Sequence, residues 1–272
     1  MKKNIQKVRA RVVKAKEIEL TKRLHMYSIL ENYYQDVNWS EFQHDLSEKT
    51  HVILLENPET GICGFSTILC KEIVVDGKSV TAVFSGDTIL EKRFWGSPAL
   101  GIQFLVYLWR LRLRNPFKPV YWLLISKGYK TYLLMANNFA WYFPHIKRET
   151  PEFEKNLMLK FYSSKFGKNY DHQTGIINFG SKATAKLKSN VAPISKELSG
   201  QVPKIGFFEA KNPHWQEGNE LACVARMTFL MPVQYVLKKI FSRNKKLKLG
   251  TQPIYTDESR TGQILAESSN AR

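Results

Sequence analysis

The sequence predicts a mixed α/β fold, with a central mixed sheet, flanking helices and a C-terminal extension. Two observations predict it. Residues 51–90 hold three β-rich runs separated by turns, which is typical of an antiparallel meander. Residues 93–126 then read as a loop, an apolar helix and a strand, which indicates a crossover to a parallel neighbour. A meander followed by a crossover gives one sheet with both strand orientations.

The first fifty residues are predicted to form one strand and two helices. Residues 8–13 read Val-Arg-Ala-Arg-Val-Val, and this alternation predicts a strand. Apolar residues recur at helical spacing over 15–34, and Ser40 is suited to cap a short helix over 40–47.

The meander is predicted from its turns as much as from its strands. Asn-Pro-Glu-Thr-Gly at 57–61 has turn chemistry, and Asp76-Gly77 between two β-rich runs is a strong hairpin signal. The predicted strands are 51–56, 62–75 and 79–90.

A glycine- and proline-containing loop at 93–101 leads into the crossover. The helix that follows is predicted to end before Asn115-Pro116. Later elements are expected as a strand over 118–126, helices over 100–114, 129–137 and 150–166, strands over 176–179, 205–208 and 221–229, and a loop or partly ordered helix over 183–202.

The charge balance favours acidic partners. The chain has 41 Lys and Arg against 24 Asp and Glu, a net charge of +17. A phosphate-bearing cofactor, an acidic carrier protein, an anionic membrane surface and nucleic acid all remain open on charge alone. Residues 221–250 contain no acidic residue, so they are either a solvated tail or a surface for an acidic carrier protein or anionic lipid.

The cysteines and the apolar runs indicate a cytoplasmic protein without a metal site. Three cysteines with no CxxC pair argue against a disulfide framework and against a zinc knuckle. No apolar run of signal-peptide type follows Met1. The longest apolar stretch, 99–108, is shorter than the roughly 20 residues that span a bilayer.

The loop before the predicted helix has the chemistry of an anion site. Unpaired N–H groups at a helix start, together with the helix dipole, attract phosphate. Gly96 lets the backbone approach closely, and Arg93 adds positive charge.

The order of elements and the run Arg93-x-x-Gly96-x-x-Ala99 resemble the GNAT superfamily of N-acyltransferases, whose phosphate turn reads Q/R-x-x-G-x-G/A. Pro98 departs from that pattern and lacks an N–H donor. The resemblance covers about residues 8–140, and more weakly the chain resembles a branch that attaches fatty acyl groups to peptide amines. It implies acyl-CoA or a phosphopantetheine-linked carrier protein as co-substrate, with no permanently bound cofactor. The implied donor-binding residues are Thr88, Ile89, Leu90, Arg93, Gly96, Ser97, Ala99, Leu100 and Gly101.

Asp87 is the predicted general base. It follows Gly86 inside an otherwise apolar strand, where partial desolvation raises a carboxyl pKa toward a useful range. The alternative is a structural Asp at a strand kink.

Three further side chains are candidates for proton transfer. The family often places a Tyr acid on the helix after the next strand, where this chain has Leu134. Tyr129 and Tyr132 are the nearby substitutes, with core packing as the alternative for either. His145 lies in an aromatic loop and can titrate near neutral pH, with a surface or hydrogen-bonded structural histidine as the alternative.

The predicted function is transfer of an acyl group, including a fatty one, from acyl-CoA or an acyl carrier protein to an amine on a peptide or small metabolite. The alternative is a non-enzymatic basic module on a similar fold that binds nucleic acid or an anionic membrane surface. Nucleic acid is less favoured because the basic residues are spread along the chain and no nucleic-acid motif occurs. The predicted division is an acyl-donor-binding core over 1–150, an acceptor-side half that completes the sheet over 151–250, and a disordered tail over 251–272.

Overall fold

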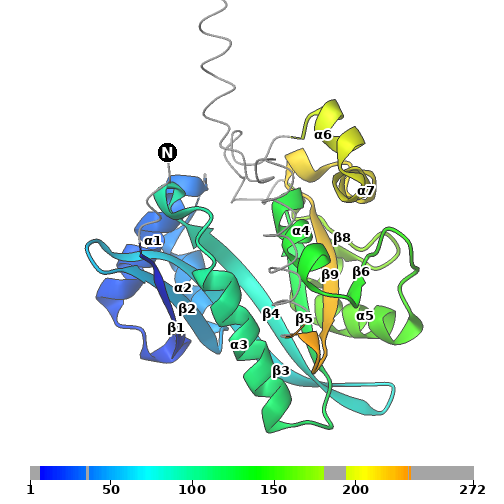
Figure 1. Cartoon of the computed structure of the whole chain (residues 1–272), viewed down its shortest axis with the longest axis horizontal. Coiled ribbons are helices and arrows are strands. Elements are labelled where there is room, and N and C mark those ends of the chain that lie inside the picture. The colour runs from blue at the N-terminus through cyan, green and yellow to red at the C-terminus, as the bar shows by residue number, and fades with distance from the viewer. Residues whose placement is uncertain (1–6, 35–36, 181–193, 232, 234–272) are drawn as a thin grey trace, which may run out of the picture. The chain divides into compact units, whose positions relative to one another are not determined.

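The computed structural model describes residues 7–34, 37–180, 194–231 and 233, and within them nine strands join one mixed sheet (Figure 1). The order across the sheet is β1-β2-β3-β4-β5-β9-β8-β7, and β6 pairs with β9. The strands are β1 (Arg9–Lys14), β2 (His51–Asn57), β3 (Gly61–Val75), β4 (Lys78–Leu90), β5 (Val120–Ser126), β6 (Tyr142–Phe143), β7 (Tyr170–Asp171), β8 (Ile176–Ile177) and β9 (Glu220–Met227).

The strand orientations confirm the predicted fold class. Strands β1 to β4 are antiparallel neighbours, β4 and β5 are parallel, and β5 pairs with β9 antiparallel. The β3–β4 hairpin turns at Asp76 and Gly77, whose φ angles of 46° and 74° are those of a primed hairpin turn. The predicted meander and parallel crossover are therefore both present.

Helices cover both faces of the sheet because side chains on each strand alternate between the faces. On one face, Phe104 and Leu108 of α3 pack with Trp122, and α4 and α7 join the same core. On the other face, α1 and α2 pack over β2 and β3, and α5 packs over β4, β5 and β9. The helices are α1 (Leu20–Tyr33), α2 (Trp39–Ser47), α3 (Ala99–Arg114), α4 (Tyr129–Asn138), α5 (Glu152–Phe166), α6 (Lys196–Gln201) and α7 (Pro203–Lys211).

A β-bulge on β4 is the irregularity that matters for the site. Ser66 pairs with Thr88 and Ile68 pairs with Ser85, so two residues of β4, Gly86 and Asp87, lie opposite the single residue Thr67. Bulges bend the strand that carries the extra residue. The parallel ladder to β5 ends at Ser85 and Leu124, and beyond that point the two strands diverge (Figure 1).

Some predicted elements are wrong or shorter than expected. The predicted strand over 205–208 lies inside helix α7. Pro203 occupies its first turn, and the residues it buries, Ile205 and Phe208, are three apart, as a helix requires. Helix α1 begins at Leu20, after a 3₁₀ turn over 15–17, instead of at Ala15.

Other sequence predictions stay untested. Those for 183–193, 234–249 and 251–272 lie outside the described residues. The division into a donor-binding core and an acceptor-side half also remains a prediction, and strands from both halves belong to the one sheet.

Gly86→Ala should destabilise the fold. A Cβ at Gly86 would lie 2.5 Å from Thr67 Oγ1 and 3.0 Å from Lys49 Cε, both in packed surroundings. Overpacking of this kind lowers the free energy of unfolding by about 1–3 kcal/mol, and the urea concentration at the unfolding midpoint should fall accordingly. Gly101→Ala is the matched control, because a Cβ there meets nothing within 4 Å. Equal midpoints for Gly86→Ala and the wild type would contradict a tightly closed bulge.

Candidate functional site

A cavity of about 510 Å³ opens where β4 and β5 diverge. Strand β4 contributes residues 84–90, and the segment after β5 contributes Lys127, Lys130 and Thr131. Residues of α1, α2 and α5 and the start of β9 complete the walls. The predicted donor-binding residues Thr88, Ile89 and Leu90 and the predicted base Asp87 all line this cavity.

Asp87 is a half-buried carboxyl without a partner of its own. Within the described part of the chain, no hydrogen bond or ion pair engages it. Burial holds the pKa of Asp87 above its usual range, the Asp45 carboxylate adds to this, and nearby lysine ammonium groups act against it. A desolvated carboxyl with a raised pKa is suited to accept a proton near neutral pH.

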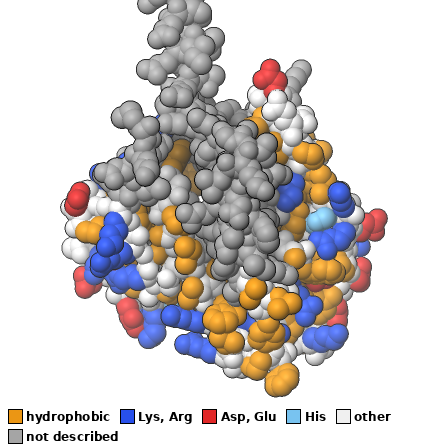
Figure 2. Space-filling view, in the orientation of Figure 1, with side chains coloured by type: hydrophobic (Ala, Val, Ile, Leu, Met, Phe, Trp, Pro, Cys, Tyr) orange, Lys and Arg blue, Asp and Glu red, His pale blue; other side chains and the backbone are white. Residues whose placement is uncertain are grey.

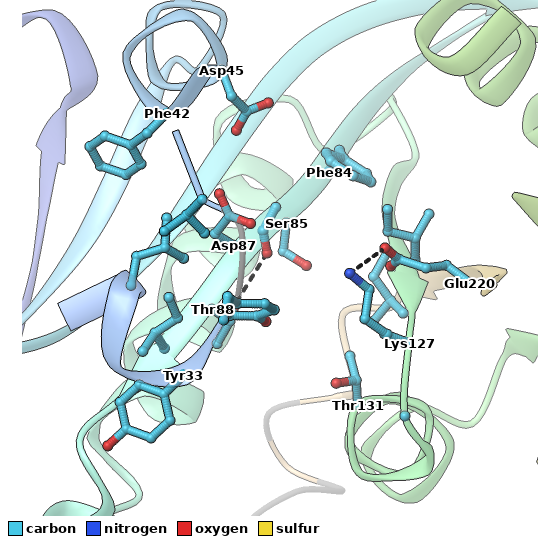
Figure 3. A pocket seen from close by; sticks show the side chains of 18 of the residues that line it. Tyr33, Phe42, Asp45, Phe84, Ser85, Asp87, Thr88, Lys127, Thr131 and Glu220 are labelled. Atoms are coloured by element: carbon cyan, nitrogen blue, oxygen red, sulfur yellow. Dashed lines mark hydrogen bonds and ion pairs between the residues drawn. The ribbon is translucent and has the colours of Figure 1, made fainter. Parts of the chain in front are cut away.

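An ion pair lies across the gap from Asp87 (Figure 3). Lys127 Nζ is 3.3 Å from Glu220 Oε1, and the two side chains are only 19% and 10% exposed. Burial raises the pKa of Glu220, Lys127 lowers it, and the Asp87 carboxylate raises it further. The two carboxyls therefore share one electrostatic environment. Glu220 was not among the predicted site residues, although a Glu opening the apolar strand β9 was the signal for it.

A second ion pair supports Asp87 from the side of α2. The Lys49 side chain is 1% exposed, pairs with the Asp45 carboxylate and donates to the Asp45 carbonyl oxygen at 3.2 Å. Lys49 also packs against Gly86, so its charge lies beside the bulge. Figure 3 shows the Asp45 and Asp87 carboxyls on the same side of the cavity.

The edge of β4 that faces β5 is open beyond the bulge. Successive residues of a strand turn their N–H groups to opposite edges. Glu91 N–H donates to Cys63 on β3 at 2.9 Å, so Ile89 also faces β3, whereas Thr88 and Leu90 face the open side. The carbonyl of Leu90 fits this pattern, because it accepts from Trp95 Nε1 at 2.7 Å. The amides of Thr88 and Leu90 are thus available to a ligand carbonyl in the cavity.

The predicted anion loop adjoins the cavity, which reaches it at Trp95. The first amide bonded within α3 is that of Ile102, to Pro98 oxygen at 3.0 Å, so the Leu100 and Gly101 amides have no intrahelical partner. A Cβ at Gly101 would meet nothing within 4 Å, which leaves space for an anion.

The other loop residues are placed as follows. Gly96 has a φ of 90°, a conformation that only glycine adopts readily. Ser97 N–H is engaged by Phe94 oxygen at 3.1 Å, and Ser97 Oγ accepts from Ala99 N–H at 3.4 Å. Arg93 Nε donates to Glu91 at 2.6 Å, so its charge is partly neutralised. None of these residues lines the cavity itself.

Tyr132 and His145 lie away from the cavity. Tyr132 is fully buried in α4, its hydroxyl donates to Pro144 oxygen at 3.1 Å, and burial raises its pKa. His145 packs on Tyr142 with ring centres 4.6 Å apart, and burial lowers its pKa. The structure does not bring either residue to Asp87. The hydroxyl missed by sequence reasoning is that of Tyr34, which lines the cavity and has a pKa raised by burial, by Asp87 and by Glu220.

No clustered metal ligands and no spanning helix occur in the described ranges. No group of three or more His, Cys, Asp or Glu residues is placed to hold a metal ion there. Likewise, no helix built from those residues has the length and apolar character needed to cross a bilayer.

No protein-family model and no curated protein matches the chain. Solved structures match parts of it. A conserved Enterococcus faecalis protein described as a probable N-acyltransferase is 11% identical, with a TM-score of 0.37, over 49% of this chain and 33% of its own. An Escherichia coli GNAT family N-acetyltransferase, YhbS, solved with CoA, is 15% identical, with a TM-score of 0.33, over 44% of this chain and 64% of its own. Arabidopsis thaliana glucosamine-6-phosphate N-acetyltransferase is 16% identical, with a TM-score of 0.31, over 42% and 80%. The match thus spans a third of the Enterococcus chain and under two thirds of the Escherichia one.

Asp87→Asn should raise the melting temperature near neutral pH. The folded pKa of Asp87 lies above the unfolded one, so the folded state binds that proton more tightly. The proton on Asp87 therefore stabilises the fold fully at a pH below the pKa of the unfolded state, and this stabilisation is lost as the pH rises through the pKa of the folded state. Asparagine removes the buried charge, so its advantage is largest near neutral pH and shrinks on acidification toward about pH 4. Thermal unfolding of both proteins across this range measures the difference.

Asp171→Asn is the control of opposite sign. Hydrogen bonds from Thr174 Oγ1 and Gln173 N–H lower the pKa of this exposed carboxyl. Its ionised form therefore stabilises the fold above the unfolded pKa, and its replacement should lower the melting temperature near neutral pH. An Asp87→Asn protein that melts below the wild type would indicate a structural carboxylate instead.

Proposed function

We propose that this protein is an N-acyltransferase of the type that the resemblance to the GNAT superfamily implies, with acyl-CoA or an acylated carrier protein as donor and an amine as acceptor. The observation that carries the proposal is the position of Asp87. An unpaired carboxyl of raised pKa lies at the divergence of two parallel strands, beside an open strand edge. Base, carbonyl-binding amides and cavity thus come together in one place.

The donor is proposed to lie along the open edge of β4. There the amides of Thr88 and Leu90 can hold the thioester carbonyl and stabilise the oxyanion that forms on it. The phosphates of the donor would reach the unpaired amides of Leu100 and Gly101, where the α3 dipole favours negative charge. Because Pro98 provides no N–H and Ser97 N–H is engaged, fewer loop donors remain than the family pattern implies.

The reaction needs one base and one acid. Asp87 takes a proton from the acceptor ammonium, and the free amine attacks the thioester carbon. The C–N bond forms as the carbonyl becomes an oxyanion, and then the C–S bond breaks and the thiolate takes up a proton. The nitrogen loses its remaining extra proton as the amide forms, and this proton replaces the one given to the thiolate. We propose Tyr34 as the source of that proton in place of Tyr132 and His145, because Tyr34 alone of the three lines the cavity.

The walls of the cavity favour a cationic acceptor and an apolar acyl chain. The carboxyls of Asp45, Asp87 and Glu220 would attract an alkylammonium group before it is deprotonated. The rings of Phe42 and Phe84 offer apolar surface, where each buried CH₂ contributes about 0.8 kcal/mol. These apolar walls support a fatty acyl group over an acetyl group as the group transferred.

The proposal is tested by donor binding and by turnover. Acyl-CoAs of increasing chain length should raise the melting temperature, because a ligand of the folded state stabilises it by mass action. With alkyl diamines as acceptors, release of free thiol should fall by about 10²–10⁴-fold in Asp87→Asn, while the thermal shift with donor persists. No shift and no thiol release with any acyl-CoA or acylated carrier protein would favour the basic binding module instead. An unchanged rate of thiol release in Asp87→Asn would show that Asp87 is not the general base.

Gly101→Glu should weaken donor binding. A carboxylate on the first turn of α3 would repel the donor phosphates from the amides that bind them. A loss of about tenfold or more in CoA affinity, measured by calorimetry, is expected. Arg114→Gln is the matched control, since it lowers the net charge by the same amount at the opposite end of α3. Equal losses in both variants would show a general charge effect and no phosphate site.

A further inference from the structure

Helix α3 has an apolar stripe on its outer side as well as on its buried side. Phe104 and Leu108 face the core. Ile102, Trp109 and Leu113 follow one another at spacings of seven and four, which places them on one line of the helix opposite the core. They are 44%, 38% and 49% exposed. A surface helix normally shows polar residues there, so packing among the described residues does not explain this stripe.

Two neighbouring segments extend the stripe. Phe117, in the turn after α3, is 99% exposed, and Phe229 and Leu230 after β9 are 44% and 65% exposed. The Arg112 guanidinium lies 4.0 Å from the centre of the Phe229 ring and donates to Lys118 oxygen at 3.0 Å, so it links these segments. We call Ile102, Trp109, Leu113, Phe117, Phe229 and Leu230 the outer α3 surface.

Positive charge borders this surface. Arg110 and Arg114 lie beside the stripe and, with Lys14, line a hollow of about 360 Å³. The acidic residue in that hollow, Glu17, is paired with Lys14 at 2.9 Å. In Figure 2, hydrophobic side chains gather toward the C-terminal end of α3, with Lys and Arg side chains next to them.

We propose that the outer α3 surface binds an anionic lipid bilayer. Exposed aromatic and aliphatic tips bordered by arginine are the chemistry of an interfacial contact, in which the tips enter the headgroup region and the cations meet lipid phosphates. Phe117 projects wholly into solvent, which suits insertion between headgroups. A second copy of the chain is a poorer occupant, because each carries a net charge of +17 and the same cations would meet. The proposal does not depend on the acyltransferase assignment.

The test uses the full chain and sedimentation with vesicles of phosphatidylcholine, alone or mixed with phosphatidylglycerol. The chain should bind the mixed vesicles, and more weakly as salt is raised. Leu113→Gln with Phe117→Ser should lower the partition coefficient about tenfold or more, because two apolar side chains no longer enter the bilayer. Leu20→Gln with Leu24→Gln, exposed at 60% and 50% on α1 over the opposite face of the sheet, is the matched control and should bind as the wild type does.

A local readout separates insertion from loose charge attraction. Brominated lipids should quench the fluorescence of the bound wild type, and Trp109→Phe should lose part of that quenching while still sedimenting. Melting temperatures close to the wild type would show that the variants fold. Equal sedimentation with neutral and anionic vesicles, or equal losses in the α1 control, would overturn the proposal. So would self-association that Leu113→Gln with Phe117→Ser abolishes without any vesicle binding, because a second copy would then cover this surface.

Discussion

The site depends on one departure from regular sheet geometry, the bulge that sets Gly86 and Asp87 against Thr67. The bulge bends β4 away from β5, so the parallel ladder ends at Ser85 and the β4 edge beyond it has no strand partner. The same residue insertion directs Asp87 into the gap. Strand separation, open amides and a desolvated carboxyl are therefore three consequences of one local irregularity.

Buried ammonium groups around the cavity are paired with carboxylates, whereas the Asp87 carboxyl has no such partner among the described residues. Lys49 is paired with Asp45, Lys127 with Glu220 and Lys165 with Glu48, so all three buried ammonium groups have a carboxylate partner. Removing a partner from such a pair leaves an uncompensated charge, which is why these pairs persist. Asp87 has no direct partner, and burial together with the Asp45 carboxylate raises its pKa although nearby lysines act against this. Desolvated groups of this kind cluster at functional sites, and this desolvation cost is the reason for the proposal that Asp87 is the base.

Local sequence signals predicted the N-terminal half of the fold. The Asp76-Gly77 turn, the alternating strands and the apolar helix after the loop are each encoded within a few residues, and the predicted meander and crossover follow from them. The position of Asp87 in the cavity was predictable for the same reason, since a carboxyl inside an apolar strand is visible in the local sequence. Its neighbours were not, because Glu220 reaches the cavity only through the pairing of β9 with β5, about a hundred residues along the chain. The prediction of a strand over 205–208 was wrong because a short apolar segment is compatible with a strand or a helix, and packing against its neighbours decides which one forms.

Helix α3 contributes to both proposed surfaces, mainly at opposite ends. Its first turn carries the free amides assigned to donor phosphates, and its far end leads to Phe117. Sixteen residues at a rise of 1.5 Å each separate these ends by about 24 Å. A phosphate at the first turn is thus well beyond a Debye length, about 8 Å at physiological salt, from Arg114 at the last. Ile102 lies in the first turn beside Gly101 and belongs to the boundary between the two surfaces, whereas lipid bound over the part of the outer α3 surface from Trp109 to Phe117 would leave the donor site open. A bilayer there would instead hold the cavity at a fixed distance from the interface, which suits a donor or acceptor with a long apolar chain.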